Sequence, residues 1–382
     1  MLQCKRLHNL LIRTWNSPFA PGGRLTMAND ESKLRMVKKI RSSMTIKQVA
    51  QKAGVSTATV SRVITGKAPV SDELTHRVQE AISILDYHTN RTARGLRART
   101  MQKVGVVLSD MQNPFFTRTL SGIEKVLLDA DYVLLLGNSD ENPKREQIHL
   151  DMFSSEGVDG IIVSIATSDP KSYQKILRAG IPLVLIDRVL PGLKVDSVVV
   201  NNIRGAFQAT EHLIHLGHRR IGFIGGIPQM STSSERKEGY LQALVEQHIP
   251  VSATLIVNGN FRQEGGYMAM QQLLDMKEPP TAVLVANNLM TLGALRKIHE
   301  YRLSIPNDLA VIGFDDMDWA TSLNPPLTVV AQPSYEMGLI AAELLLSRTQ
   351  ESSSPTQQVV LETTLIIRKS CGAPESSKEY SS

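Results

Sequence analysis

The sequence predicts a multidomain protein in which a small all-α helix-turn-helix headpiece precedes a larger α/β domain of two doubly wound parallel-sheet subdomains. Residues 44–64 have the apolar spacing of two short helices joined by a tight turn. From Lys103 onward, near-continuous apolar runs alternate with helical stretches, which indicates parallel strands buried on both faces. The repeats are numerous enough for two sheets.

The first helix of the headpiece is expected to begin after Thr45, a good N-cap, and Gln48 stands where it completes a capping box. Gly54 ends the helix, because glycine takes a positive φ without a Cβ penalty. The apolar residues between these ends predict one buried face: Ile46, Val49, Ala50 and Ala53.

The second helix is expected to start at Ser56 as its cap and to direct Val60, Val63 and Ile64 inward. Small and hydroxylated residues remain on its outer face, together with one arginine: Thr57, Ala58, Thr59, Ser61 and Arg62. Such a face suits the DNA major groove, since small side chains permit close approach and arginine bonds guanine with two parallel donors. A helical hairpin with an ordinary polar surface is the alternative interpretation. A third helix after Pro69 and Ser71 closes the headpiece.

The order A-x-x-A-G-V-S-x-x-T-V-S-R is more specific than the helix pattern. It resembles the headpiece of the LacI/GalR family of bacterial transcription regulators, and the matching residues are Ala50, Ala53, Gly54, Val55, Ser56, Thr59, Val60, Ser61 and Arg62. The resemblance implies sequence-specific binding of double-stranded DNA. We expect Thr57, Ala58 and Arg62 to contact bases, and Ser56, Thr59 and Ser61 to contact phosphates; Thr45 is added to this DNA-binding set.

A basic segment at 90–103 follows the headpiece, and its N-R-x-A-x-x-L pattern resembles the hinge helix of the same family. The resemblance implies that Leu96 wedges into the minor groove and kinks the DNA, with Asn90, Arg91, Arg94 and Arg97 on the backbone. We expect this hinge to fold only on DNA. A solvated basic linker is the alternative interpretation.

Charge is divided unevenly along the chain. Residues 1–43 carry nine Lys/Arg against two Asp/Glu, residues 44–103 carry ten against four, and residues 104–382 carry 23 against 31. A basic front on an acidic body indicates nucleic-acid binding by one module. Two cysteines at opposite ends, Cys4 and Cys371, provide no disulfide framework and suit a reducing, cytoplasmic (bacterial, nucleoid-associated) setting.

The predicted domains have the following bounds. Residues 1–43 form a disordered basic extension, or arise from a start codon assigned too far upstream; an arm that adds phosphate contacts is a third possibility. The headpiece spans 44–89, and the hinge and linker span 90–103. The α/β domain spans 104–370, with subdomains of about 104–200 and 203–330 and with C-terminal segments that cross between them. Residues 371–382 form a flexible tail. The polar tail lacks apolar heptads, so a homodimer on a pseudo-palindromic operator is expected.

The α/β domain resembles the periplasmic-binding-protein-like (type I) effector domain of the same family. Strands are expected at Val104–Leu108, Tyr132–Leu136, Gly160–Ser164, Leu183–Ile186, Ile221–Ile224, Ala282–Val285 and Ala310–Ile312. Ligands of such sheets bind at the carboxyl ends of the strands, in the cleft between the halves. The residues expected to contact a small-molecule effector there are Asp110, Phe115, Arg188, Arg236, Phe261, Asn287 and Asp315; Phe116 is assigned to the core or a dimer interface.

The effector is expected to be a sugar or sugar derivative. Met230 stands where purine-binding members place arginine, and Asn288 stands where the family commonly has Asp. Arg188 and Arg236 together favour a sugar acid or sugar phosphate, although each also fits an ordinary ion pair. No cofactor, no metal-ligand spacing and no catalytic constellation is found, so the protein is not expected to be an enzyme. The rival hypothesis is a sugar-binding protein without specific DNA binding.

Overall fold

The computed structural model describes residues 45–65, 69–85, 87, 102–350 and 355–374. The chain divides into two compact units, residues 1–90 and 91–382, which are described separately. The predicted hinge residues Asn90, Arg91, Arg94, Leu96 and Arg97, the extension 1–43 and most of the tail lie outside the described residues. No helix in the described ranges is long and apolar enough to span a membrane.

The described residues of the first unit form three helices, α2 (Ile46–Ala53), α3 (Thr57–Thr65) and α4 (Asp72–Ile84). The Gln48 side chain accepts from the Thr45 backbone N–H at 2.8 Å, and Gly54 takes φ 64° at the end of α2. Arg77 on α4 donates to the Ala53 carbonyl at 2.7 Å and so satisfies the same helix end. The buried core consists of Val49, Ala50, Ala53, Val60, Val78 and Ala81. The predicted helix-turn-helix is confirmed.

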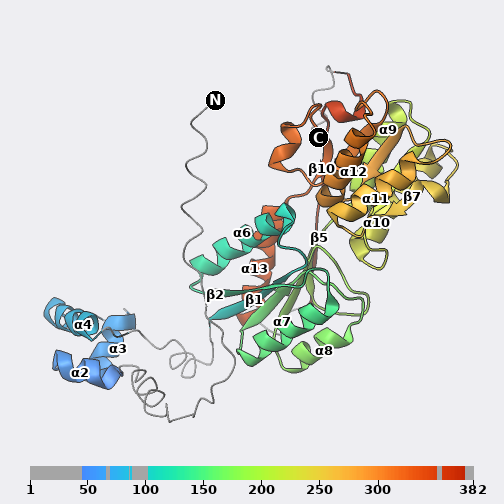
Figure 1. The fold of residues 1–382 in the computed structure, drawn as a ribbon. Coiled ribbons are helices and arrows are strands. Elements are labelled where there is room, and N and C mark those ends of the chain that lie inside the picture. Colours follow the sequence, from blue (N-terminus) through green and yellow to red (C-terminus); the bar gives the residue numbers. More distant parts are fainter. Residues whose placement is uncertain (1–44, 66–68, 86, 88–101, 351–354, 375–382) are drawn as a thin grey trace, which may run out of the picture. The chain divides into compact units, whose positions relative to one another are not determined.

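The first sheet of the second unit is wholly parallel, with strand order β11-β5-β4-β3-β1-β2. The strands are β1 (Lys103–Leu108), β2 (Val133–Asn138), β3 (Gly160–Val163), β4 (Leu183–Ile186), β5 (Asp196–Val200) and β11 (Gln358–Leu361). Helices α6 (Pro114–Asp129) and α13 (Ser334–Gln350) pack on one face, and α7 (Pro143–Ser155) and α8 (Lys171–Arg178) on the other (Figure 1).

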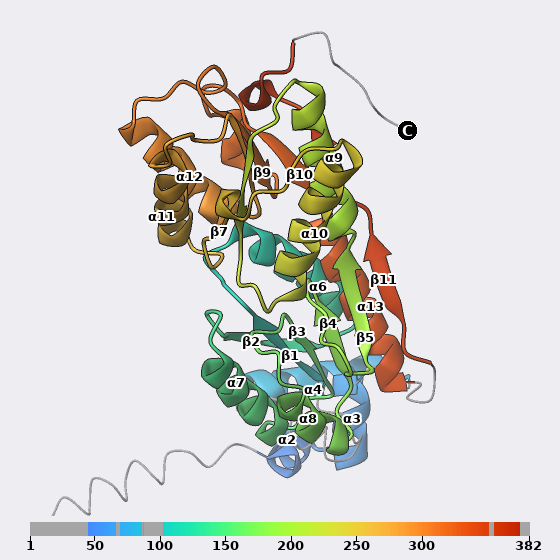
Figure 2. The same ribbon diagram turned by 90° about the vertical axis from the view of Figure 1, so that its right-hand side faces the viewer.

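The second sheet has the order β12-β10-β9-β8-β6-β7, and only β12 runs antiparallel to its neighbour. Its strands are β6 (Ile221–Gly225), β7 (Ile256–Asn258), β8 (Ala282–Val285), β9 (Ala310–Phe314), β10 (Thr328–Ala331) and β12 (Thr364–Ile366). It lies between the helix pair α9 (Asn202–His215) and α10 (Ser231–Glu246) and the pair α11 (Gln263–Leu274) and α12 (Asn288–Glu300) (Figure 2). Short 3-10 turns lie at Ala253–Leu255, Asp318–Thr321 and Lys369–Cys371.

The chain passes between the two sheets three times: after β5, after β10 and after β11. The chain after β10 therefore packs α13 on the first sheet, adds β11 to that sheet and then adds β12 to the second. All seven strands expected from apolar runs are present, and the fold class predicted from the sequence is confirmed. Five strands were not anticipated: β5, β7, β10, β11 and β12.

Helices α6 and α13 cross at two glycines. A Cβ added at Gly338 would lie 2.0 Å from the Thr119 carbonyl oxygen, and one at Gly122 would lie 2.1 Å from the Tyr335 carbonyl oxygen. The two backbones therefore meet without side chains between them, and this contact fixes the returning helix on the first sheet.

Gly338→Ala should lower the free energy of unfolding by roughly 1–3 kcal/mol, because the methyl group forces two packed helices apart. Glu343→Ala, at an exposed position of the same helix, is the matched control and should stay within about 0.5 kcal/mol of the wild type. Denaturant unfolding of the full chain measures both. Equal stability of G338A and wild type would contradict the close crossing.

Candidate functional site

The outer face of α3 presents the residues predicted to contact DNA. Ser56, Thr57, Ala58 and Arg62 are exposed, whereas Thr59 and Ser61 are half-buried. The Ser56 hydroxyl caps the helix by accepting from the Thr59 N–H at 3.1 Å, and the two hydroxyls lie 2.9 Å apart. Thr45, also exposed, occupies the N-terminus of α2. The helix-turn-helix thus presents one small, polar face that ends in an arginine.

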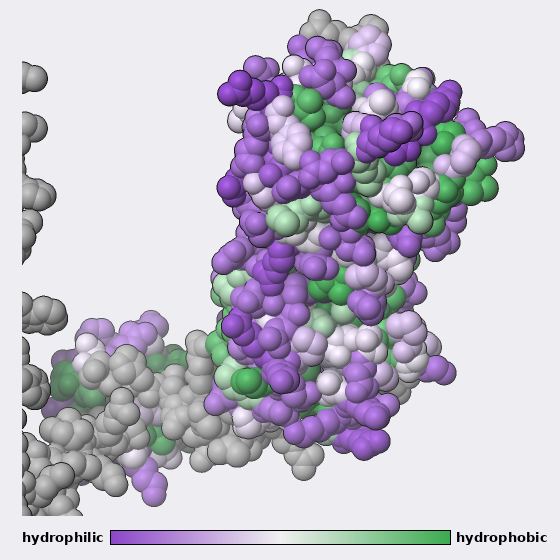
Figure 3. Space-filling view, turned by 45° about the vertical axis from the view of Figure 1, so that its right-hand side comes forward, coloured by the Kyte–Doolittle hydropathy of each residue, from purple (hydrophilic) through white to green (hydrophobic). Residues whose placement is uncertain are grey.

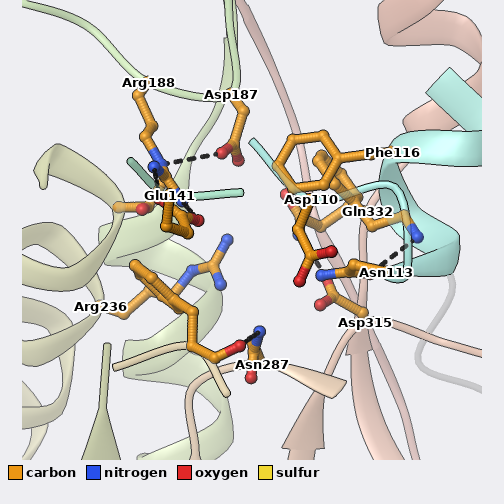
Figure 4. Close-up of a pocket in the computed structure, with 13 residues that line it drawn as sticks. Asp110, Asn113, Phe116, Glu141, Asp187, Arg188, Arg236, Asn287, Asp315 and Gln332 are labelled. Atoms are coloured by element: carbon orange, nitrogen blue, oxygen red, sulfur yellow. Dashed lines mark hydrogen bonds and ion pairs between the residues drawn. The ribbon is translucent and has the colours of Figure 1, made fainter. Parts of the chain in front are cut away.

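A cavity lies in the second unit between the two sheets (Figure 4). It is lined by Asp110, Asn113, Phe115, Phe116, Glu141, Asp187, Arg188, Thr232, Arg236, Phe261, Asn287, Asp315 and Gln332. All seven residues predicted to contact an effector are among them. Phe116 lines the cavity as Phe115 does, and both also pack in the same apolar core, so the structure does not separate them as the sequence analysis expected.

The two sheets supply equivalent residues to this cavity. Asp187 directly follows β4, and Asp315 directly follows β9. Each has a positive φ, 68° and 75°, and each donates its backbone N–H to the next strand, at Val198 and Val330. The carboxyl ends of the parallel strands in each sheet face the same cleft. Asp187 therefore reaches the cleft from the first sheet, and Asp315 reaches it from the second.

Arg188 is held by protein carboxylates. Its Nη1 and Nη2 donate to the two oxygens of Glu141 at 2.7 and 2.6 Å, Nη1 also donates to the Ile165 carbonyl at 2.8 Å, and Nε lies 3.2 Å from Asp187 Oδ2. Burial opposes the charge, but Glu141 and Asp187 together keep the pKa of Arg188 above its ordinary value. The guanidinium carbon stands 5.1 Å from the centre of the Phe261 ring.

Arg236 is positioned by a different set of groups. Its Nε donates to Asn202 Oδ1 at 2.7 Å, and Nη1 donates to the Ala286 carbonyl at 2.6 Å. The guanidinium lies 3.8 Å over the Phe314 ring. Burial lowers the pKa of Arg236, and the nearby Asp315 and Asp187 offset part of that effect. Among the described residues Nη2 has no hydrogen-bond partner, so it remains available to a ligand.

Three aspartates of the cavity, Asp110, Asp187 and Asp315, have a raised pKa and are easier to protonate than ordinary aspartates. Burial raises the pKa of Asp187 to about 6, against the opposing attraction of Arg188 and Arg236. Burial also raises the pKa of Asp315 and of Asp110. Four carboxylates and two guanidinium groups line the cavity, so its formal charge is negative.

Besides Phe116, five lining residues were not predicted from the sequence as effector contacts: Asn113, Glu141, Asp187, Thr232 and Gln332. Asn113 caps α6 by accepting from the Phe115 N–H and also accepts from the Asn288 side chain at 2.7 Å, across the cleft. Glu141 follows β2 by three residues, so a systematic search of strand ends would have found it, whereas Thr232 lies in the first turn of α10. The Thr232 hydroxyl and Gln332 Oε1 are buried with no hydrogen-bond partner within the described part of the chain. Such groups are suited to a bound polar ligand.

Arg262 closes one side of the cleft. From the second subdomain it donates to Asp110 Oδ2 at 2.9 Å and to the side chain and backbone carbonyl of Asp140 at 2.6 and 2.8 Å, and both aspartates belong to the first subdomain. Its neighbour Phe261 lines the cavity. The ion pairs hold the strand-end loops of the two sheets together.

A helix-turn-helix headpiece joined to a two-sheet domain with a ligand-sized cleft defines the class of DNA-binding regulators that respond to small molecules. Comparison with known proteins agrees. Residues 45–90 match the model "Bacterial regulatory proteins, lacI family", and residues 210–371 match "Periplasmic binding protein-like domain". The ribose operon repressor of Haemophilus influenzae is 35% identical over 326 residues, which cover 85% of this chain and 98% of that protein.

Two solved structures show the same architecture. One is a complex of the transcriptional regulator CelR with cellobiose, with 33% identity, TM-score 0.66 and coverage of 86% of this chain and 99% of that chain. Another is the lac repressor dimer bound to operator and an anti-inducer, with 26% identity, TM-score 0.77 and coverage of 87% and 100%. The chain belongs to the LacI family of bacterial transcription repressors, which are not enzymes.

The pKa of Asp187 has a consequence for stability. It is about 6 in the folded state against an ordinary value of 3.8, so between these values the native state binds more protons than the unfolded state. The stabilisation from protonating Asp187 is present at low pH and is lost as the pH rises through 6. On lowering the pH from 7 to 5, wild type should gain about 1 kcal/mol relative to Asp187→Asn. A constant difference in unfolding free energy at the two pH values would contradict the burial of an ionisable Asp187.

Proposed function

We propose that this protein binds a specific, pseudo-palindromic operator through its headpiece and that a small polyhydroxylated effector in the cleft controls that binding. The observation that carries the proposal is the combination, in one chain, of an exposed α3 face suited to the major groove and a cleft with unpaired polar groups. The lac repressor structure, which is bound to operator, supports DNA binding by the headpiece, and the CelR–cellobiose complex supports effector binding in the cleft. A repressor of this kind acts in the cytoplasm, on the nucleoid.

The cleft is suited to a sugar. Asp187 and Asp315 provide acceptors, Arg236 Nη2 and Asn287 provide donors, and Thr232 provides a hydroxyl, an arrangement that suits neighbouring ligand hydroxyls. Phe115, Phe116 and Phe261 supply apolar ring surface.

We propose a homodimer as the DNA-binding form, which pairs two headpieces on one operator. Strand β2 is the edge of the first sheet, and Val133 and Leu136 on it are exposed. Helix α7 packs against β2, and its Ile148 and Met152 are exposed as well. Hydrophilic residues cover most of the face visible in Figure 3, so apolar residues clustered at one sheet edge are a suitable dimer surface.

Replacing Arg62 with Ala should cost about 1–3 kcal/mol of binding free energy on the selected operator and relax the preference at one base pair. Lys52→Ala is the control: this exposed lysine ends α2, and its loss removes the same charge without removing a base contact. Binding-site selection at two salt concentrations measures both effects. An R62A profile identical to that of K52A would refute base recognition by Arg62, and weak, sequence-blind binding by wild type would favour the rival sugar-binding protein.

Arg236→Lys should weaken effector binding by roughly tenfold or more while operator affinity without effector stays within about twofold, because lysine keeps the charge but loses the planar fork. Lysine is chosen because Arg236 also supports Asn202 and the Ala286 carbonyl, so truncation to alanine would disturb the fold. Titration calorimetry with D-ribose as the first probe, and DNA binding in parallel, separate the two effects. Unchanged sugar affinity would remove Arg236 from the site.

A further inference from the structure

Glu141 is a charged residue of the cleft to which neither the sequence analysis nor the family comparison assigns a role. Its side chain is 7% exposed and its two oxygens face the two terminal nitrogens of Arg188, whose side chain is 3% exposed. Asp140 and Glu141 both have φ 54°, a conformation that residues other than glycine rarely adopt, and the Glu141 N–H donates to the Ser109 carbonyl at 2.9 Å. The loop after β2 is thus shaped to direct this carboxylate at the arginine.

The pairing changes what Arg188 offers to a ligand. Both protons of Nη1 and one of Nη2 are donated to protein oxygens, and Nε faces Asp187. One face of the guanidinium stands over Phe261. Arg188 therefore keeps two donors open, one proton of Nη2 and Nε, which is buried without a hydrogen-bond partner in the described part of the chain, and its charge is balanced inside the protein.

The remaining charges of the cleft do not attract an anion either. Arg236 is the second arginine, and Asp187 and Asp315 both act on its charge. Asp110 is paired with Arg262. A ligand carboxylate or phosphate would lose its hydration among four carboxylates. The open cationic donor that it would meet there is Arg236 Nη2, whose charge is already attracted by Asp187 and Asp315.

We propose that Glu141 determines the charge class of the effector: by occupying Arg188 it restricts the cleft to uncharged sugars and excludes sugar acids and sugar phosphates. This proposal rests on the effector role of the cleft proposed above. It opposes the expectation, drawn from the two arginines alone, that the effector is anionic. Removing the charge of Glu141 releases an arginine in the same cavity and makes the site accept anions.

The test compares pyranoses that keep their ring and differ only in one terminal carboxylate: D-glucose with D-glucuronate, and D-galactose with D-galacturonate. Binding to the full chain is measured by titration calorimetry at pH 7.5. Glu141→Gln keeps the size of the side chain and removes its charge, and should tighten binding of at least one acid by about tenfold or more relative to wild type. Glu156→Gln is the matched control, because Glu156 pairs with Lys103 on the surface, away from the cleft. In this variant the ratio of acid affinity to neutral-sugar affinity should be the same as in wild type for both pairs of sugars.

A double variant, Glu141→Gln with Arg188→Gln, replaces the buried ion pair by two neutral amides. It should lose the acid binding gained by E141Q, which assigns the gain to Arg188. If E141Q does not fold, wild type and Glu141→Asp, which keeps the charge, still provide a test: both should bind the neutral sugar of a pair better than its acid. Wild type that binds an acid as tightly as its neutral partner, or folded E141Q with no gain for either acid, would overturn the proposal. A failure of the proposed function would be seen in a different measurement, because wild type would then bind no specific operator.

Discussion

Buried charges at the carboxyl ends of two parallel sheets are the constraint on which the arrangement of the cleft depends. Asp187 and Asp315 leave equivalent strands at positive φ and face a common space, and each needs compensation because a buried charge without a partner is costly. Arg188 and Arg236 provide that compensation, and each is in turn fixed by further groups, Glu141 for the first and Asn202 for the second. A ligand that replaces or extends these bonds changes the balance of charge in both subdomains at once.

The connections across the cleft show how such a change would be transmitted. Arg262 links the second subdomain to Asp110 and Asp140 of the first, and the Asn288 side chain donates to Asn113. Three passages of the main chain join the same two subdomains. Two partners in these links, Asp110 and Asn113, also line the cavity, and so does Phe261, the neighbour of Arg262. Occupancy of the cavity and the relative position of the subdomains therefore depend on the same side chains. That shared dependence is the physical basis for coupling effector binding to operator affinity.

Much of this organisation follows from local sequence. The headpiece was predictable because its apolar spacing, caps and Gly54 all agree. Most of the expected cavity residues were predictable because parallel strands end at one edge, and the family resemblance added support for Asn287 and Asp315. Arg236, inside α10, was expected from that resemblance. The missed strands are short or begin with polar residues: β5 starts at Asp196, β11 at Gln358, and β7 has three residues. Gln332 was missed with β10, which it follows. The Arg188–Glu141 pair spans 47 residues and the Arg262–Asp110 pair 152; no local pattern indicates which of many charged residues will meet at such separations.

The central claim is that one molecule recognises a specific DNA sequence and releases or retains it according to the occupancy of the cleft. The most direct measurement is selection of genomic fragments by the full chain, performed without sugar and again with a panel of neutral monosaccharides. We expect enrichment of a single pseudo-palindromic sequence, with a steep dependence on salt, and a change in its retention with at least one sugar. Two results would contradict coupling between the cleft and the headpiece: no common sequence is enriched, or the enriched sequence is retained equally with and without every sugar.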